Sequence, residues 1–207
     1  MPVPTVVYML KAPQPGRVKT RLALDVGDEE ACTVYRGLAE RQYRALPPGW
    51  PVEIHFAPPE AEDQIRLWLP GATLYAPQSD GDLGDRLAAA SAATFERGVC
   101  CAFFIGADCP DLNLEDFAAA LRLLSRDHDA VFGPARDGGY YLLAVNRHVP
   151  ELFSGIPWST GTVLEHSLEK AGLLGLNCAL LQEKEDIDDL ASLRRCLPES
   201  ITTRNSD

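Results

Sequence analysis

The chain has 207 residues, of which 46% are hydrophobic and 24% charged, and its formal net charge is −11. This size and composition are typical of one globular domain with a sizeable core. The acidic balance argues against a protein that binds nucleic acid or an anionic membrane, because both attract basic surfaces. The sequence shows neither a signal-peptide pattern nor a long apolar stretch, so we expect a cytoplasmic protein with no membrane partner.

Apolar runs and helical periodicity alternate along the chain. We expect strands over 5–10, 52–57, 72–76, 101–105, 129–134, 140–146 and 176–181. We expect helices to end at residues 24, 46, 69, 97, 125, 171 and 197, with the last one beginning at residue 187. Asn113 is the expected cap of the helix that ends at 125, and Thr162-Val-Leu-Glu165 predicts a capping box for the helix that ends at 171. The alternation predicts a doubly wound α/β domain over residues 1–201, followed by a frayed tail at 202–207. The sheet becomes mixed if the runs on either side of 137–139 pair antiparallel.

The cysteines form neither a C-x-x-C pair nor a cysteine–histidine zinc pattern. We therefore expect free thiols that act as small buried hydrophobic residues in a reducing cytoplasm. The six positions are Cys32, Cys100, Cys101, Cys109, Cys178 and Cys196.

An isolated carboxylate, Asp108, follows the apolar run that begins at Cys101. In open α/β sheets, ligands bind outside the carboxyl ends of the strands, so this position suits a divalent cation that carries phosphate oxygens. The alternative is that Asp108 only caps a turn, because Asp-x-Pro is common in loops.

The loop after the first strand is basic, although the whole chain is acidic. Residues 1–24 contain no Asp or Glu, whereas Lys11, Arg17, Lys19 and Arg21 lie close together. A basic loop between a strand and a helix is typical of a phosphate site. It matches neither G-x-G-x-x-G nor a P-loop. The alternative is a solvated run of surface charge.

Polar or glycine-rich loops also follow later strands, at 78–86, 106–112 and 136–139, and in a parallel sheet they meet at one edge. Asp186, Asp188 and Asp189 follow the last strand and offer a second source of carboxylates. Their alternative role is to complement the dipole of the last helix.

Six motifs in order resemble a bacterial family of GT-A-like glycosyltransferases, some of which are assigned to arsenosugar biosynthesis. They are Lys11-Ala-Pro-x-Pro-Gly-Arg-Val-Lys-Thr-Arg-Leu, Gly81-Asp-Leu-Gly-Asp-Arg, Gly106-Ala-Asp-Cys-Pro, Asp137-Gly-Gly-Tyr-Tyr-Leu, Pro157-Trp-Ser-Thr and Asp186-Ile-Asp. The resemblance runs from about residue 5 to residue 193. It extends to the nucleotide-diphospho-sugar transferase superfamily, and it implies a single domain with a mixed, mainly parallel sheet flanked by helices.

The resemblance also implies a divalent metal, Mg²⁺ or Mn²⁺, with Asp108 as first ligand and Asp188 as second. This chain has Asp189-Leu190 where the superfamily usually has Thr-Pro, which weakens the match at Asp188. The nucleotide-binding residues implied are Lys11, Arg17, Lys19 and Arg21 around the phosphates, and Gln78, Gly81 and Gly84 near base and ribose. Those bordering the sugar or acceptor are Asp137, Gly138, Gly139, Trp158, Ser159 and Thr160. Trp158 is equally well explained as a hydrophobic anchor.

Three functions remain open from the sequence. The first is a metal-dependent glycosyltransferase with a nucleotide-diphospho-sugar donor and a small-molecule acceptor, in which Lys19 assists the leaving group and Asp137 is the candidate general base. The second is a nucleotidyltransferase that joins an NTP to a phosphorylated acceptor, because the basic loop resembles that of phospholactate guanylyltransferases. The third is a non-catalytic nucleotide-sugar binder. The sequence does not indicate an oligomeric state.

Overall fold

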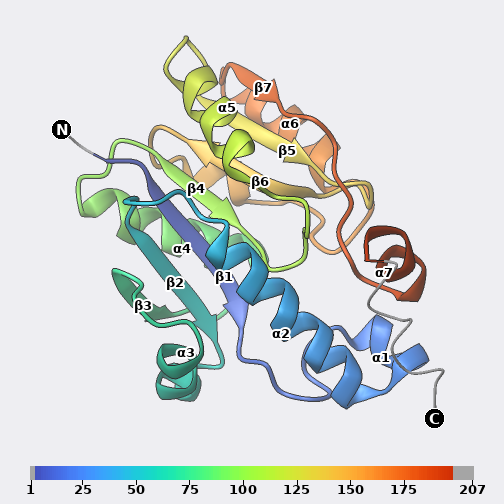
Figure 1. The fold of residues 1–207 in the computed structure, drawn as a ribbon. Coiled ribbons are helices and arrows are strands. Elements are labelled where there is room, and N and C mark those ends of the chain that lie inside the picture. Colours follow the sequence, from blue (N-terminus) through green and yellow to red (C-terminus); the bar gives the residue numbers. More distant parts are fainter. Residues whose placement is uncertain (1–2, 198–207) are drawn as a thin grey trace.

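A seven-stranded sheet forms the centre of the molecule, in the order β3-β2-β1-β4-β6-β5-β7 (Figure 1). The computed structural model describes residues 3–197. The strands are β1 (Thr5–Lys11), β2 (Val52–Ala57), β3 (Leu74–Pro77), β4 (Ala102–Ile105), β5 (Ala130–Pro134), β6 (Tyr140–Val145) and β7 (Cys178–Leu180). The helices are α1 (Thr20–Val26), α2 (Asp28–Arg44), α3 (Glu62–Trp68), α4 (Leu83–Glu96), α5 (Leu114–Leu124), α6 (Val163–Leu173) and α7 (Leu190–Cys196). Two short 3₁₀ turns are η1 (Pro59–Ala61) and η2 (Pro150–Phe153).

One strand, β6, runs against the rest of the sheet. It pairs antiparallel with both β4 and β5, whereas the pairs β1–β2, β1–β4, β2–β3 and β5–β7 are parallel. The prediction of a mixed, mainly parallel sheet is therefore confirmed. Because β5 is antiparallel to β6, which is itself antiparallel to β4, the loop after β5 emerges at the same edge as the loops after β1 and β4.

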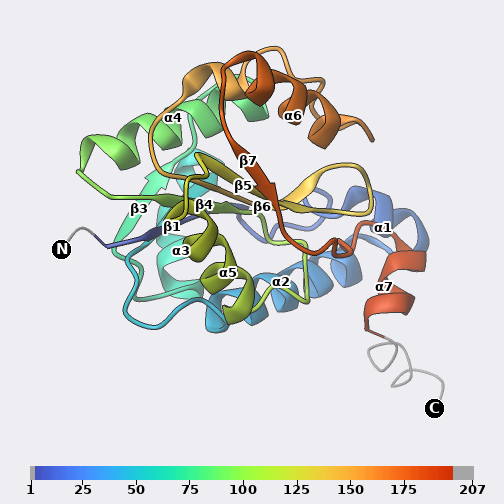
Figure 2. The same cartoon turned by 90° about the horizontal axis from the view of Figure 1, so that it is seen from above.

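Helices cover both faces of the sheet (Figure 2). The elements α4 and α6 lie on one side, and α2 and α5 lie on the other. Strand side chains alternate between two buried clusters, so that Tyr8 and Phe103 pack toward α2 and α5 while Val7 and Phe104 pack toward α4. A third cluster joins α1, α2 and α7 at one end of the molecule. The strands are thus held from both sides, which fixes where their carboxyl ends emerge.

Several local predictions differ from the structure. The last helix begins at Leu190 rather than at residue 187, and η2 was not expected. Thr162 precedes α6 but makes no side-chain cap, so the capping box that its sequence suggests is wrong. By contrast, Asn113 does cap α5, as predicted. The predicted tail at 202–207 and the end of the predicted domain lie outside the described residues.

All six cysteines are free thiols, as expected. The adjacent pair Cys100 and Cys101 precedes β4 instead of lying within it, and their sulfur atoms are 3.6 Å apart. Between residues 3 and 197, no helix is both long and apolar enough to cross a membrane.

Candidate functional site

A cleft of about 960 Å³ opens at the carboxyl ends of the central strands. It is lined by residues from the segments after β1, β3, β4 and β5, and by the linker between β7 and α7. The prediction that these loops meet at one edge is therefore confirmed. The cleft also extends to residues 156–163, just before α6 and at its start.

Lys19 lies at the centre of the polar part of the cleft. Its backbone is left-handed, with φ 47°, and its side chain is only 4% exposed. Its Nζ is 2.5 Å from Asp108 Oδ1 and 3.1 Å from Asp188 Oδ1. Burial lowers the pKa of Lys19, but the two carboxylates outweigh burial and raise this pKa above its usual value. One ammonium therefore joins two carboxylates that are far apart in the sequence.

Hydrogen bonds to the backbone hold the loop that carries Asp108. Gln42 Nε2, from α2, donates to the carbonyl of Cys109 at 2.9 Å, and the N–H of Ile187 donates to the carbonyl of Asp108 at 2.9 Å. The carboxylate of Asp108 is thus free to pair with Lys19. Among the described residues no backbone N–H donates to this carboxylate, which argues against a turn cap as its main role.

Three acidic residues within the four positions before α7 have different roles. Asp189 caps α7 by accepting from the N–H of Ser192, which matches the helix-dipole alternative. Asp188 instead turns to Lys19, with Arg21 3.9 Å away. Asp186 faces the cleft, and its Oδ1 is buried with no hydrogen-bond partner among the described residues. Burial, and next the negative charges of Asp108 and Asp137, raise the pKa of Asp186 to about 7.

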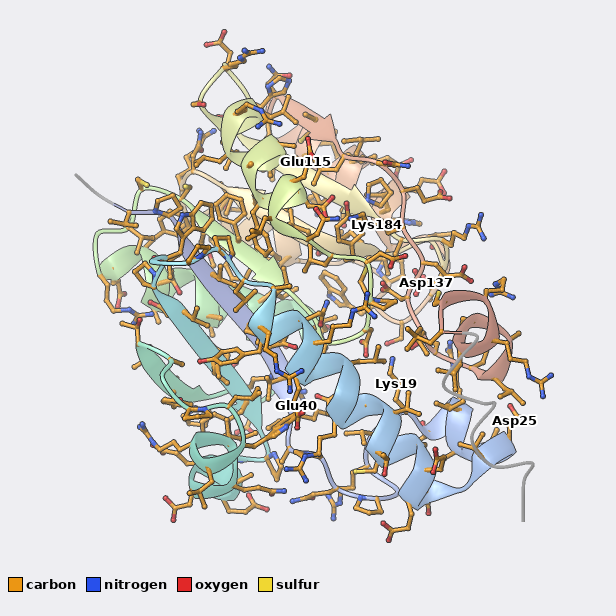
Figure 3. All side chains as sticks on the ribbon, in the orientation of Figure 1. Lys19, Asp25, Glu40, Glu115, Asp137 and Lys184 are labelled. Carbon is orange, nitrogen blue, oxygen red and sulfur yellow. The ribbon has the colours of Figure 1, made fainter. Side chains whose placement is uncertain are left out.

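The loop between β5 and β6 packs closely against the segment before α6. Gly138 has φ +88°, and a Cβ at this position would lie 1.9 Å from the carbonyl oxygen of Gly161. A glycine is therefore required here on two grounds. The turn presents Asp137 to the cleft, with the N–H of Gly139 donating to its Oδ1 at 2.8 Å. Figure 3 shows Asp137 on this loop and Lys19 on the side of α1 and α2.

A second close contact joins α4 to the segment before α6. A Cβ at Gly84 would lie 2.4 Å from the carbonyl oxygen of Phe153 and 2.5 Å from Trp158 Nε1. The Trp158 ring packs edge-on against Tyr140, with centroids 6.4 Å apart. Trp158 therefore anchors the chain, as the alternative role suggested, and it also lines the cleft. Its Nε1 is buried and has no acceptor among the described residues.

Most of the residues predicted for the site line this cleft. They are Lys11, Lys19, Arg21, Gln78, Asp108, Asp137, Gly139, Trp158, Ser159, Thr160 and Asp188. Arg17, Gly81, Gly84 and Gly138 do not line it, although Gly84 and Gly138 shape the segments that do. The roles of all these residues remain predictions.

Sequence reasoning missed three residues of the cleft. The sequence offers Asp186 either as a carboxylate source or as helix-terminal charge and gives it no ligand role, although its spacing from Asp188 is the signal that could have placed both near a cation. Arg86 lines the cleft from α4 and received no role. Tyr35, on α2, exchanges hydrogen bonds of 2.8 and 2.9 Å with the backbone of Lys11, and no local pattern foretells this contact.

The family model described as "Uncharacterized protein conserved in bacteria (DUF2064)" matches residues 42–160. The chain belongs to this family. A search of curated proteins by sequence found no match. Among solved structures, a "putative nucleotide-diphospho-sugar transferase" from Desulfovibrio desulfuricans G20 is 30% identical, with a TM-score of 0.89, over 99% of this chain and 90% of that one.

More distant structures share the fold. A CMP:2-keto-3-deoxy-manno-octonic acid synthetase in complex with CTP is 14% identical, with a TM-score of 0.60 over 93% of this chain and 96% of that one. Rv0371c from Mycobacterium tuberculosis H37Rv in complex with manganese is 13% identical, with a TM-score of 0.55 over 95% of this chain and 99% of that one. The chain therefore has the nucleotide-diphospho-sugar transferase fold. The 30% identity to the Desulfovibrio structure over almost the whole chain assigns it to the transferase class of enzymes.

Proposed function

We propose that this protein is a metal-dependent glycosyltransferase that uses a nucleotide-diphospho-sugar and a small-molecule acceptor. One observation carries the proposal: the carboxylates of Asp108 and Asp188 converge on a single cationic group at the carboxyl edge of the sheet. Carboxylates arranged in this way suit a hard divalent cation that also binds phosphate oxygens. The position agrees with the general rule for ligand sites in open α/β sheets.

The donor set fits Mg²⁺ or Mn²⁺. Within residues 3–197, no three His, Cys, Asp or Glu side chains form a group that could hold a metal ion by themselves. Such a complete cage is not needed, because Mg²⁺ is usually bound by one or two carboxylates together with water and substrate phosphates. Asp108 and Asp188 are 42% and 39% exposed, so both can accept a ligand from the cleft. The unpartnered Oδ1 of Asp186 adds a buried acceptor nearby.

The charge of the cleft also favours a cation that arrives with the nucleotide. Its lining aspartates are Asp82, Asp108, Asp137, Asp186 and Asp188, and its basic residues are Lys11, Lys19, Arg21 and Arg86. Because the pKa of Asp186 is raised to about 7, the negative and positive charges of the lining nearly balance, and the cleft by itself offers a diphosphate little net attraction. A divalent cation held by Asp108 and Asp188 would add positive charge there and would stabilise the diphosphate as a leaving group.

The remaining steps belong to the side chains. Lys11, Lys19 and Arg21 bind the phosphate oxygens. The acceptor hydroxyl oxygen forms a bond to the anomeric carbon of the sugar, and the bond from that carbon to the diphosphate oxygen breaks. Asp137 takes the hydroxyl proton from the acceptor side, where its turn presents a carboxylate to the cleft.

A ligand-stabilisation screen tests the proposal. The protein is heated with nucleoside diphosphates and nucleotide sugars, with and without Mn²⁺. A ligand at about 100 times its Kd stabilises the folded state by about 2.7 kcal/mol. For a chain of this length, that raises Tm by several degrees. We expect stabilisation that requires both Mn²⁺ and a nucleotide, and its complete absence would refute the proposal.

Two variants separate the site from the fold. Asp108→Asn removes a charge from the proposed metal site and should abolish the Mn²⁺-dependent shift without unfolding the protein. Asp111→Asn makes the same change in the same loop, at an exposed residue that does not line the cleft. We expect this control to keep the full shift. Equal loss in both variants would contradict the assignment of Asp108.

Nucleotidyl transfer is the second candidate, supported by the likeness to a synthetase solved with CTP. In this reaction an oxygen of a phosphorylated acceptor attacks the α-phosphorus of an NTP, and pyrophosphate leaves. Lys19 then contacts the transferred phosphate. Pyrophosphate release from an NTP and a metabolite extract would favour this reaction, whereas turnover of sugar nucleotides alone would exclude it.

A binder without turnover is the third candidate. It predicts that Asp108→Asn leaves both nucleotide affinity and metal dependence unchanged. The titration of this variant with the nucleotide found in the screen therefore distinguishes an enzyme from a binder.

A further inference from the structure

Arg86 is a basic residue of the cleft without an anionic partner. It lies in the first turns of α4 and lines the cleft, and its side chain is partly buried. Its Nε is buried with no hydrogen-bond acceptor among the described residues. None of the carboxylates in the described part of the chain lies within ion-pair distance of its guanidinium. A buried N–H without an acceptor is costly, so its persistence needs an explanation.

The nearest carboxylates along the helix have other partners. Asp82 stands four residues before Arg86, a spacing that favours an ion pair on a helix. Its carboxylate instead accepts from the N–H of Asp85 at 2.9 Å, and the carboxylate of Asp85 accepts from the N–H of Asp82 at 3.0 Å. This reciprocal cap closes the start of α4 and leaves Arg86 without its local counterion.

The start of α4 is also fixed in place. Gly84 packs against the carbonyl oxygen of Phe153 and against Trp158 Nε1, with no room for a side chain. Leu87, one residue after Arg86, is buried in the core beside the sheet. Because the helix is held on these sides, the backbone of Arg86 keeps a fixed place in the wall of the cleft.

The other basic residues of the cleft differ from Arg86. Lys19 pairs with two carboxylates, and Arg21 lies 3.9 Å from Asp188. Lys11 is exposed, so water solvates its ammonium. Arg86 is therefore the partly buried cation of the described cleft that has no counterion. A guanidinium in such a position can bind two oxygens of one oxyanion at once, and phosphate and carboxylate are the groups that fit.

We propose that Arg86 forms an oxyanion subsite in the cleft, separate from the Lys19–Asp108–Asp188 cluster, and that it binds a phosphate or carboxylate group of the small-molecule ligand. The inference rests on the proposed function in that both use the same cleft. Two sources share this chemistry: a phosphate of the nucleotide itself, or an anionic group on the sugar or acceptor. In either case Arg86 selects for ligands that carry an oxyanion at this position.

The test compares Arg86→Gln with Arg122→Gln by isothermal titration calorimetry. Arg122 is an exposed residue of α5 outside the cleft, so its variant removes the same charge without touching the subsite. The first set of probes is the nucleoside diphosphates with Mn²⁺. The second set is inorganic phosphate and malonate, titrated into the nucleotide-free protein and into the protein saturated with the diphosphate that binds best. Melting curves of both variants establish that they fold.

We expect Arg86→Gln to lower the affinity for at least one set of probes by tenfold or more. Arg122→Gln should leave the affinity for both sets within twofold of that of the unaltered protein. Loss of nucleoside diphosphate affinity identifies the nucleotide as the source of the oxyanion. Loss of phosphate or malonate binding in the saturated protein identifies the sugar or acceptor. Arg86→Lys should recover part of the affinity, because it restores the charge without the bidentate geometry.

Two results would overturn the inference: unchanged affinity of Arg86→Gln for every probe, or equal losses in Arg86→Gln and Arg122→Gln. If the unaltered protein binds nucleoside diphosphates and Arg86→Gln binds them and the other anions equally well, the subsite is wrong while the proposed function stands. If no nucleotide binds, the proposed function fails, and phosphate and malonate binding to the nucleotide-free protein still decides the subsite.

Discussion

Lys19→Met is the substitution that most directly tests how the acidic pair works. The ammonium of Lys19 occupies the space between Asp108 and Asp188, at 2.5 and 3.1 Å from their oxygens. Methionine is similar in length and apolar, so it suits a position that is only 4% exposed. The variant therefore removes a cation that competes with a metal ion for the same two carboxylates. We expect tighter binding of Mn²⁺ in the absence of nucleotide.

The magnitude follows from distance and exposure. Unit charges about 4 Å apart interact by about 1 kcal/mol in bulk water and about 4 kcal/mol at an effective dielectric of 20. Both carboxylates are about two-fifths exposed, with fractions of 42% and 39%, which places the effect toward the lower value. A change of about 1.4 kcal/mol corresponds to a tenfold gain in Mn²⁺ affinity. The loss of stability should be about 1 kcal/mol, because water can solvate the two released carboxylates.

The assay is a titration of nucleotide-free protein with Mn²⁺, in which electron paramagnetic resonance reports the free ion. Lys11→Met is the matched control, because it removes a positive charge from the same cleft without an ion pair to either carboxylate. Unchanged or weaker Mn²⁺ binding in Lys19→Met would refute the reasoning, as would an equal gain in Lys11→Met. In the presence of Mn²⁺, Lys19→Met should bind nucleoside diphosphates more weakly than the unaltered protein.

Three further predictions concern stability. Burial raises the pKa of Glu53, but hydrogen bonds from a neighbouring histidine, arginine and threonine outweigh burial and lower this pKa to about 2. The ionised Glu53 therefore contributes its full stabilisation of the folded state above about pH 4.5, and this contribution is lost as the pH falls toward 2. Urea unfolding between pH 4.5 and pH 2 should show that the free energy of unfolding falls by up to about 3 kcal/mol, and that this fall is absent in Glu53→Gln. The same dependence of stability on pH in both proteins would disprove it. Lys184→Met leaves the buried carboxylate of Asp116 without its ammonium and should cost about 3 kcal/mol in urea unfolding, whereas a cost below about 1 kcal/mol would contradict a buried pair. Gly138→Ala should lower Tm by several degrees more than Gly27→Ala. Both glycines have positive φ, but only at Gly138 would the added Cβ meet a backbone carbonyl. Equal melting curves of the two variants would argue against this close contact.

Local patterns in the sequence determined most of the fold. Val52–Ala57 was predicted at its observed bounds, and Asn113 was recognised as the cap of α5. Such signals are short in range, because they depend on alternation, on side-chain caps and on residues that end helices. They failed at Thr162, whose hydroxyl pairs with Thr160 and makes no cap. There the N–H of Leu164, in the first turn of α6, donates to the carbonyl of Gly138, a contact that the local pattern does not reveal.

The sequence predicted which types of residue form the site, but not which of them pair with one another. The carboxylate of Asp108, the basic loop and the late acidic segment could each be read from the sequence, and the rule for strand ends brought them to one edge. The sequence could not assign Asp188 to Lys19 and Asp189 to a helix cap, because the two residues are identical and adjacent. The path of the chain after β7 makes that distinction.

What the sequence by itself determined is the order of strands and helices and the chemical types of residue at each strand end, since both follow from contacts within a few residues. Tertiary structure decided which groups share one space. Lys19 meets Asp188 across 169 positions, and Arg86 lacks a counterion because Asp82 and Asp85 cap α4 instead. Such pairings depend on how the sheet and its helices pack, because only the packed chain fixes the distances between charged side chains.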